Sequence, residues 1–338
     1  MKIYRENESN YDFVKDKVIA VIGYGSQGDA QANMMKDSGL NVILGLREGG
    51  NSWKKAKEDG FDVYPIKDAT QKADIIQILI PDEIQQRIYE KDIAPFLTEG
   101  KVLCFSHGFN ISYKRIIPPN NVDVVMIAPK SPGPSERKVY LEGFGVPALL
   151  AVHQDYSGNA KQIALGMAKA MHFTRAGVID LNSLEGSKKN IAPFDKETFT
   201  DLFGEQSVLC GGVAELIQSG FEVMVEAGYP PEMAYFEVSH ELKLITDLIY
   251  QGGIEQMYQK VSNTAEYGGR TRGKKVIDRK VVKPVMRSLL EDIESGKFAE
   301  EWMEEADSGM PVLSKMRENE GSNQLQKVGD TLRRLFEQ

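Results

Sequence analysis

The sequence lacks several features that mark other classes of protein. Only two cysteines, Cys104 and Cys210, occur among its 338 residues, and both lie in apolar runs. The chain is therefore no disulfide scaffold and suits a reducing cytoplasm. It has no run of about 18 apolar residues, which argues against a membrane-spanning helix. Its first residues, MKIYRENESNYDF, lack the apolar core of a secretory signal. These absences predict a globular, cytoplasmic protein.

Positive charge is also scarce. The chain has 41 Lys and Arg against 49 Asp and Glu, a net charge of −8, so we expect neither nucleic acid nor an anionic membrane as a partner. Segment 201–241 contains no Lys or Arg at all and carries the whole imbalance. Such a local surplus needs a counter-charge, a solvated face or a bound cation. Its acidic residues are Asp201, Glu205, Glu215, Glu222, Glu226, Glu232, Glu237 and Glu241.

The first half of the chain alternates short apolar runs with amphipathic ones. The apolar runs are rich in β-branched residues, which is typical of buried strands. Strands separated by helical patterns predict βαβ units and a parallel sheet covered on both faces. The predicted strands are 17–23, 41–46, 73–81, 101–106, 122–129 and 147–153, and the predicted helices are 28–38, 53–60 and 82–97.

After about residue 183 strand patterns give way to helical ones. Segment 230–253 begins with Pro and ends with Gly-Gly. These residues are typical of the start and the end of a helix. The polar stretch 185–197 is predicted as a loop or linker. The other predicted helices are 207–228, 281–306 and 324–337. We therefore predict an α/β fold, with a Rossmann-like doubly wound domain over 1–183 and an all-α domain over 184–338.

The motif GYGSQG at 23–28 fits the pattern G-x-G-x-x-G and lies between a predicted strand and a predicted helix. This context favours dinucleotide binding over a simple tight turn, because the helix N-terminus then offers N–H groups to a pyrophosphate. The second strand leads into Arg47 and Ser52, which suit a 2′-phosphate and therefore NADP. Glu48 would repel that phosphate if it pointed inward, so we predict NADP with appreciable NAD use; Glu48 facing solvent is the other interpretation.

Two candidate catalytic side chains stand at the ends of consecutive predicted strands. His107 ends the fourth strand and Lys130 the fifth, and ligands of open α/β sheets bind outside these ends. A His there can move protons near neutral pH, and a Lys can neutralise an oxyanion. For either residue alone, a purely structural role would be the better interpretation.

Two acidic pairs in the helical half share one spacing. Asp201 and Glu205 are four residues apart, as are Glu237 and Glu241. The two carboxylates of each pair therefore lie on one helix face and repel each other. Their apolar neighbours favour a bound hard cation, and oxygen ligands without Cys or a His cluster suit Mg²⁺. His240 lies on another helix face and is not counted as a ligand. Two solvated helix faces remain the alternative.

These motifs together resemble those of ketol-acid reductoisomerases of the short-chain class, and the resemblance spans nearly the whole chain. The matching blocks, in the family's order, are GYGSQGDAQA, SHGF, MIAPKSPG, DLFGEQSVLCGG, AYFEVSHELKLITDLIYQGG and SNTAEYGG. The resemblance implies that His107, Lys130 and Glu205 act in catalysis. The positions that match the family's cofactor contacts are Tyr24, Gly25, Ser26, Gln27, Arg47, Gly50, Ser52, Asp82, Glu83, Ile84, Gln85 and Gly133.

The resemblance also implies a shared metal site. Asp201 and Glu205 match ligands of two Mg²⁺, with Asp201 bridging them. Glu237 and Glu241 match ligands of the second Mg²⁺ that come from a partner subunit, which requires at least a dimer. Ser262 matches a substrate contact. Three features depart from the family's pattern: Asp29 in place of the usual His, Glu48, and a longer stretch over 181–194.

An enzyme of this family converts 2-acetolactate or 2-aceto-2-hydroxybutyrate in two steps on the route to valine and isoleucine. Mg²⁺-dependent alkyl migration is followed by reduction with NADPH. Two other interpretations stay open at this point. One is a metal-free NADP-dependent 3-hydroxyacid dehydrogenase, and the other is a nucleotide-sensing module without catalysis.

Overall fold

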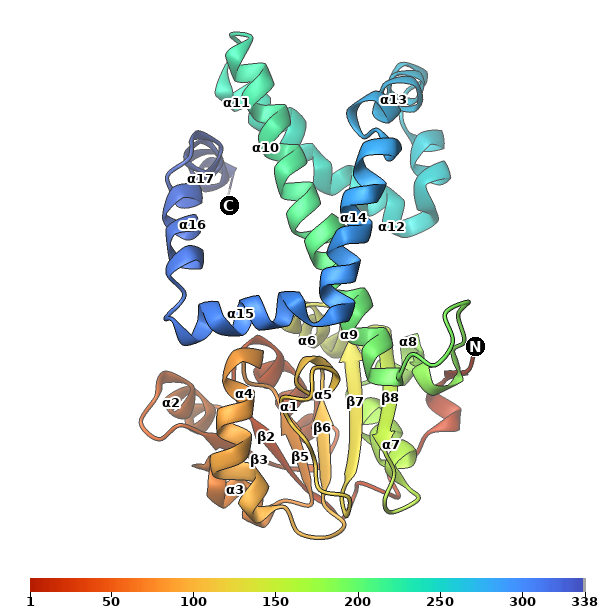
Figure 1. Cartoon of the computed structure of the whole chain (residues 1–338), viewed down its shortest axis with the longest axis vertical. Coiled ribbons are helices and arrows are strands. Elements are labelled where there is room, and N and C mark those ends of the chain that lie inside the picture. The colour runs from red at the N-terminus through yellow and green to blue at the C-terminus, as the bar shows by residue number, and fades with distance from the viewer. Residues whose placement is uncertain (337–338) are drawn as a thin grey trace. The chain divides into compact units, whose positions relative to one another are not determined.

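The computed structural model describes residues 1–336, which fall into two compact units (Figure 1). The first, Met1–Thr200, is an α/β unit, and the second, Asp201–Gln338, is a helical unit. We describe each unit by itself. Helix α9 (Pro193–Gly204) begins in the first and ends in the second.

One sheet forms the centre of the α/β unit. Its strands follow the order β1-β9-β8-β7-β6-β5-β2-β3-β4. From β4 to β7 all neighbours are parallel, whereas β8 runs antiparallel to β7 and β1 antiparallel to β9. The strands are β1 (Ile3–Tyr4), β2 (Val18–Ile22), β3 (Asn41–Leu46), β4 (Asp62–Pro65), β5 (Ile75–Ile78), β6 (Val102–Phe105), β7 (Asp123–Pro129), β8 (Ala148–Gln154) and β9 (Val178–Asp180).

Helices cover both faces of this sheet because alternate side chains of each strand enter separate cores. On β2, Ile19 and Val21 pack with one core, while Ala20 and Ile22 pack with the other. The unit's helices are η1 (Glu6–Glu8), α1 (Ser26–Asp37), α2 (Asn51–Glu58), α3 (Ile66–Lys72), α4 (Asp82–Ile88), η2 (Tyr89–Ile93), η3 (Ala94–Phe96), α5 (Phe109–Ser112), α6 (Gly133–Leu141), α7 (Ala160–Ala170), α8 (Phe173–Ala176) and η4 (Leu181–Ser183).

The strand order reverses its direction between β2 and β5. Connections from β2 run outward through β3 to β4, and then return to β5 on the other side. Ligands of doubly wound sheets bind at such a reversal, outside the carboxyl ends of the strands. The fold therefore places the glycine-rich loop after β2 at the expected ligand site.

The helical unit has a small core. Phe221, Ala234, Tyr235 and Leu332 are buried together, while many apolar side chains on its helices remain exposed. Its elements after α9 are η5 (Glu205–Leu209), α10 (Gly211–Glu226), α11 (Pro231–Tyr235), η6 (Phe236–His240), α12 (Glu241–Lys260), α13 (Asn263–Val276), α14 (Arg279–Ser295), α15 (Lys297–Asp307), α16 (Pro311–Gly321) and α17 (Gln324–Phe336).

The predicted fold class is confirmed, with corrections to single elements. Helix α9 begins at Pro193, so the last residues of the predicted loop 185–197 are helical. The predicted helix 281–306 is two helices, because Gly296 adopts a positive φ of 85° between them. Gly253 (φ 81°) kinks α12 where a helix end was predicted, and the chain continues helically beyond it. Residue 337 of the last predicted helix lies outside the described residues.

Candidate active site

The glycine-rich loop joins β2 to α1 in a tight turn. A Cβ on Gly28 would lie 2.3 Å from the carbonyl oxygen of Gly23, so only glycine lets the helix begin this close to the strand. Nothing lies within 4 Å of a Cβ at Gly25, so that side of the loop is open. The N-terminus of α1 thus faces open space, as pyrophosphate binding requires.

A cavity of about 370 Å³ opens in the α/β unit at the carboxyl ends of its central strands. It brings together six residues that the sequence assigned to the site, from the glycine-rich loop, α4 and the end of β6. Those six are Gly25, Ser26, Gln27, Asp82, Gln85 and His107. Glu83 and Ile84 lie half-buried on α4 beside them but do not line the cavity. Its size and position fit part of a dinucleotide.

The loop after β3 carries the predicted 2′-phosphate residues. Arg47, Glu48 and Ser52 are exposed, and the Gly50 N–H donates to the carbonyl oxygen of Arg47 at 3.3 Å. The guanidinium of Arg47 lies over Gly50, within 4 Å of where a Cβ there would be. Arg47 and Ser52 are therefore free to meet an incoming phosphate, and exposed Glu48 is available beside them.

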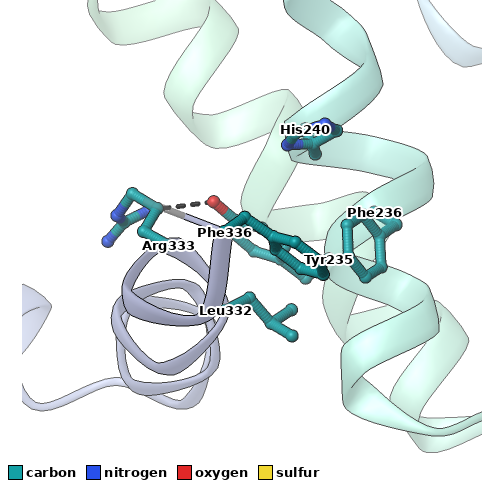
Figure 2. Close-up of a pocket in the computed structure, with 6 residues that line it drawn as sticks. All are labelled: Tyr235, Phe236, His240, Leu332, Arg333 and Phe336. Atoms are coloured by element: carbon teal, nitrogen blue, oxygen red, sulfur yellow. Dashed lines mark hydrogen bonds between the residues drawn. The ribbon is translucent and has the colours of Figure 1, made fainter. Parts of the chain in front are cut away.

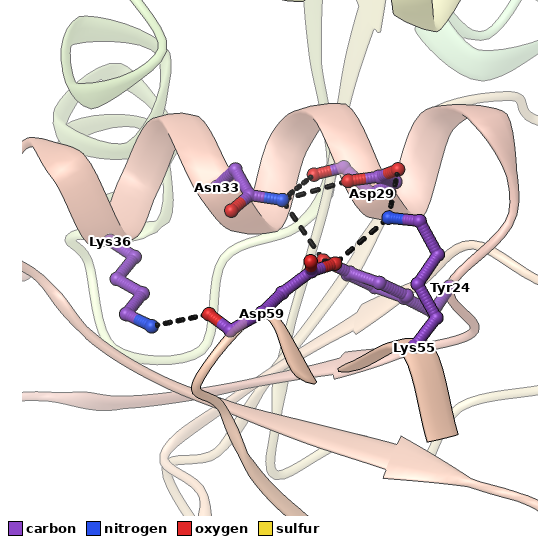
Figure 3. A network of polar contacts seen from close by, with 6 residues as sticks. All are labelled: Tyr24, Asp29, Asn33, Lys36, Lys55 and Asp59. Atoms are coloured by element: carbon purple, nitrogen blue, oxygen red, sulfur yellow. Dashed lines mark hydrogen bonds and ion pairs between the residues drawn. The ribbon is translucent and has the colours of Figure 1, made fainter. Parts of the chain in front are cut away.

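Tyr24 is not a cavity residue but part of a polar network beneath the loop (Figure 3). Its hydroxyl donates to Asp59 at 2.7 Å, and the Nζ of Lys55 lies 2.8 Å from both Asp29 and Asp59. Burial and the bond to Asp59 raise the pKa of Tyr24, so it stays a neutral donor. Hydrogen bonds with Asp29 and then Asp59 raise the pKa of Lys55. Asp29, the departure noted in the sequence, is thus paired with a cation.

Replacing Lys55 with Met is expected to weaken NADPH binding about 2- to 5-fold, because Asp29 would then present an unpaired anion beside the pyrophosphate loop. KM for NADPH should rise while kcat holds. Lys54→Met, an exposed cation on the same helix, is the matched control and should leave KM unchanged. The double variant Asp29→Asn with Lys55→Met should recover the wild-type KM. A Lys54→Met effect of equal size would contradict this account.

One carboxylate that the sequence analysis missed joins the two candidate catalytic residues. Glu197 lies on α9, and only 1% of its side chain is exposed. Its Oε2 is 3.0 Å from Nδ1 of His107, and its Oε1 accepts from Nζ of Lys130 at 2.8 Å. The N–H of Gly108 donates to the same carboxylate at 3.3 Å. His107 and Lys130 are therefore held together rather than merely near each other.

The charge state of Glu197 follows from these contacts. Burial raises the pKa of this carboxyl, but the hydrogen bond and charge of His107 and the charge of Lys130 outweigh it, so the pKa lies below its ordinary value. Glu197 is an anion at neutral pH. The spacing could have revealed it, because Glu197 stands four residues before Asp201 as Asp201 stands before Glu205.

Both acidic pairs of the helical unit lie at π-helical turns. Glu205 begins η5. Glu237 lies in η6, and Glu241 begins α12, the element that follows η6. Such turns are rare and concentrate at functional sites. Each of the four carboxylates offers hard oxygen ligands, the kind that Mg²⁺ prefers. Among the described residues of the helical unit, no three acidic side chains converge on one point.

His240 points elsewhere, into a separate pocket of about 150 Å³ (Figure 2). Tyr235 and Phe236 line this pocket, with Leu332, Arg333 and Phe336 of α17 across from them. Arg333 donates to the Tyr235 hydroxyl at 2.9 Å, which fastens the last described helix to α11. Neither Glu237 nor Glu241 lines the pocket. Ser262 caps α13, its Oγ accepting from the Ala265 N–H at 3.2 Å.

Comparison with known proteins accounts for almost the whole chain. Residues 13–177 match the family model described as acetohydroxy acid isomeroreductase, NADPH-binding domain, and residues 194–338 match ketol-acid reductoisomerase, C-terminal domain. Most of the unusual stretch 181–194 falls between the two.

Similar full-length proteins carry the same name with either cofactor. The chain is 54% identical to "Ketol-acid reductoisomerase (NAD(+))" of the uncultured archaeon GZfos26G2, covering 100% of both chains. It is 56% identical to "Ketol-acid reductoisomerase (NADP(+))" of Methanocaldococcus jannaschii, over 99% of this chain and 98% of that one. A solved NADH-preferring ketol-acid reductoisomerase from an uncultured archaeon superposes with a TM-score of 0.93 at 54% identity, covering 100% of both chains. The chain belongs to the ketol-acid reductoisomerase family.

Proposed function

We propose that this chain converts 2-acetolactate or 2-aceto-2-hydroxybutyrate to the 2,3-dihydroxy acid by alkyl migration and NADPH-dependent reduction. The single observation that carries the proposal is the buried Glu197 carboxylate between His107 and Lys130, beside the cavity at the glycine-rich loop. The family match supports it, whereas the metal-free 3-hydroxyacid dehydrogenase is not favoured, since it needs no acidic pairs.

We assign two Mg²⁺ to Asp201, Glu205, Glu237 and Glu241, the last two from a partner subunit. When bound, Mg²⁺ supplies dense positive charge that stabilises an alkoxide and polarises a ketone. Glu205 is the proposed carboxylate that takes the proton of the substrate hydroxyl. Ser262 is the proposed contact to the substrate.

His107 and Lys130 support the chemistry from the α/β unit. Lys130 offers a cation to developing negative charge on the substrate, and Glu197 fixes the position of its Nζ. Glu197 also contacts Nδ1 of His107 and so orients the ring that we assign to proton transfer. Gly25, Ser26 and Gln27 would hold the diphosphate of NADPH in the cavity that His107 also lines, and the bound cofactor would supply the hydride.

A second copy of the chain is the proposed partner. Stretch Pro193–Glu226 is long and apolar enough to cross a membrane by length and composition alone, which is weak evidence for a membrane. Only 6% of its apolar window is buried, and the stretch carries Glu215 and Glu222. Covering by a second copy explains both the exposed apolar surface and the carboxylates that do not converge within one unit. A cytoplasmic location stays a prediction.

One assay tests the proposed function. Oxidation of NADPH is followed with 2-acetolactate, with and without Mg²⁺. We expect turnover that disappears on chelation and returns with added Mg²⁺. Turnover that survives chelation would support the dehydrogenase, and absence of turnover in both conditions would support the nucleotide sensor.

Cofactor choice is proposed to depend on the loop after β3. Arg47→Ala is expected to lower the ratio of kcat/KM for NADPH to that for NADH by about 10-fold or more, because a charge-assisted bond to the 2′-phosphate is lost. Glu48→Ala should raise the same ratio. Lys54→Ala, an exposed cation on α2, is the control. An unchanged ratio in Arg47→Ala would overturn the NADP assignment of this loop.

A further inference from the structure

A chain of polar side chains runs beneath the floor of the cavity. Gln27 donates to Glu136, Gln31 donates to Gln27 at 2.8 Å and to Ser106 at 3.0 Å, and Gln77 donates to both Gln31 and Ser106 at 3.1 Å. Gln31, Gln77 and Glu136 are at most 1% exposed. Buried networks of this kind fix their members in one arrangement. It links the pyrophosphate loop with Ser106, the residue before His107.

Glu136 forms the end of this chain, on the first turns of α6. A Cβ on Gly133, at the start of that helix, would lie 2.2 Å from the carbonyl oxygen of Ser26, so α6 abuts the glycine-rich loop. The Oε1 of Glu136 accepts from Nε2 of Gln27 at 2.7 Å. Its Oε2 is buried and has no hydrogen-bond partner among the described residues. A buried carboxylate would be costly here, whereas a neutral carboxyl group is tolerated.

Among residues 1–336, no cation pairs with Glu136 to hold it ionised. Burial raises its pKa to about 7, although the hydrogen bond from Gln27 lowers it. Helix α6 packs against α1. The charged groups of these two helices and of the turn before α6 either bond to other groups or are exposed to solvent. These are Asp29 (with Lys55), Lys36 (with backbone oxygens of Asp59 and Gly60), Asp37 (with Arg137), Lys130 (with Glu197), and exposed Lys138 and Glu142.

We propose that Glu136 is a positioning residue for the cofactor, and that its neutral form is the one that permits tight binding. Neutral Glu136 holds the Gln27 amide beneath the diphosphate. Ionised Glu136 places a buried negative charge beneath the same diphosphate, where low dielectric makes the repulsion strong. The inference rests on the proposed placement of the diphosphate at Gly25–Gln27.

The test is equilibrium binding of NADPH to the full chain between about pH 6 and about pH 8.5, a range that brackets the titration. The wild-type Kd should rise about 10-fold across this range. Glu136→Gln keeps the acceptor for Gln27 and cannot ionise, so its Kd should change no more than about 2-fold. Glu142→Gln, an exposed carboxylate at the end of the same helix, should follow the wild type. The 2′-phosphate of NADPH titrates equally in all variants.

Two further variants separate the possible failures. Glu136→Ala should weaken binding at the acid end of the range, because it removes the acceptor that holds the Gln27 amide. Gly25→Val should abolish binding, because its side chain fills the open side of the loop. If Glu136→Gln shows the wild-type pH slope while Gly25→Val loses binding, the inference on Glu136 is wrong and the cofactor site stands. If Gly25→Val binds normally, the placement of the diphosphate fails, and the inference fails with it.

Discussion

A mixture of two inactive variants is expected to recover activity. Asp201→Asn and Glu237→Gln should each lower kcat by about 1000-fold or more, because each removes a proposed Mg²⁺ ligand, and such a ligand is worth several kcal/mol to the transition state. In a two-fold symmetric dimer, a mixed pair then contains one site with both ligands intact. Random mixing makes half of the dimers mixed, so about a quarter of wild-type activity should return.

The control for this experiment lies in the same acidic pair. Mixing Asp201→Asn with Glu205→Gln should restore nothing, because in the proposed site both of these residues come from one subunit. Co-expression with two affinity tags isolates the mixed dimers. Purified mixed dimers of Asp201→Asn and Glu237→Gln without activity would show that Glu237 does not come from the partner. Full activity in either single variant would instead remove that residue from the ligand set.

Replacing Glu197 with Gln is expected to damage both folding and catalysis. The variant removes the buried carboxylate that pairs with Lys130, and breaking such a pair costs about 3–5 kcal/mol. We expect a loss of stability at the lower end of this range, because the Lys130 side chain is 36% exposed and keeps access to water. Turnover should fall about 100-fold, since the Lys130 ammonium and the His107 ring lose the group that orients them. Asp195→Asn, a half-buried carboxylate on the same helix, is the control.

The difference in stability between the wild type and Glu197→Gln should decrease as the pH falls. Glu197 has a lowered pKa in the folded chain, so its contribution is complete above the ordinary pKa of a carboxyl group and is lost as the pH falls through the lowered value. The free energy of unfolding should therefore differ most between wild type and Glu197→Gln at neutral pH, and the difference should shrink in acid. Denaturant titrations at several pH values measure it. A difference that persists in strong acid would contradict the ionic origin.

Local rules of the chain were enough to predict the cofactor side of the site. A β-branched run followed by GYGSQG predicts a strand, a turn and a helix. The spacing of the glycines and the periodicity of the apolar residues are both visible within a few residues of sequence. His107 and Lys130 could be placed at one edge because parallel strands share their carboxyl ends. The direction of β8 was not predictable in this way, since an apolar run looks the same in a parallel and an antiparallel neighbour.

Glu197 shows where reasoning from local pattern stops. The residues before it, GSKKN, are polar and turn-forming, and this pattern predicts a linker up to residue 197. What fixes Glu197 is long-range: Phe194 enters the core under β6 through contact with Phe105, and Gly108 lets α9 approach, with a Cβ there only 2.3 Å from Thr198. Neither contact is visible in the spacing of residues 185–197. The domain division after residue 183 likewise stays a prediction.

The π-helical turns have a consequence for how the surface of this chain should be mapped. A π-turn holds one residue more than an α-turn, and each residue advances an α-helix by about 100°. A regular helical wheel drawn through 193–226 therefore assigns every residue after η5 to a face about a quarter-turn away from its real one. The same phase slip separates α11 from α12. Any choice of surface positions on these helices, for labels or engineered contacts, must restart its count at Gly211 and at Glu241.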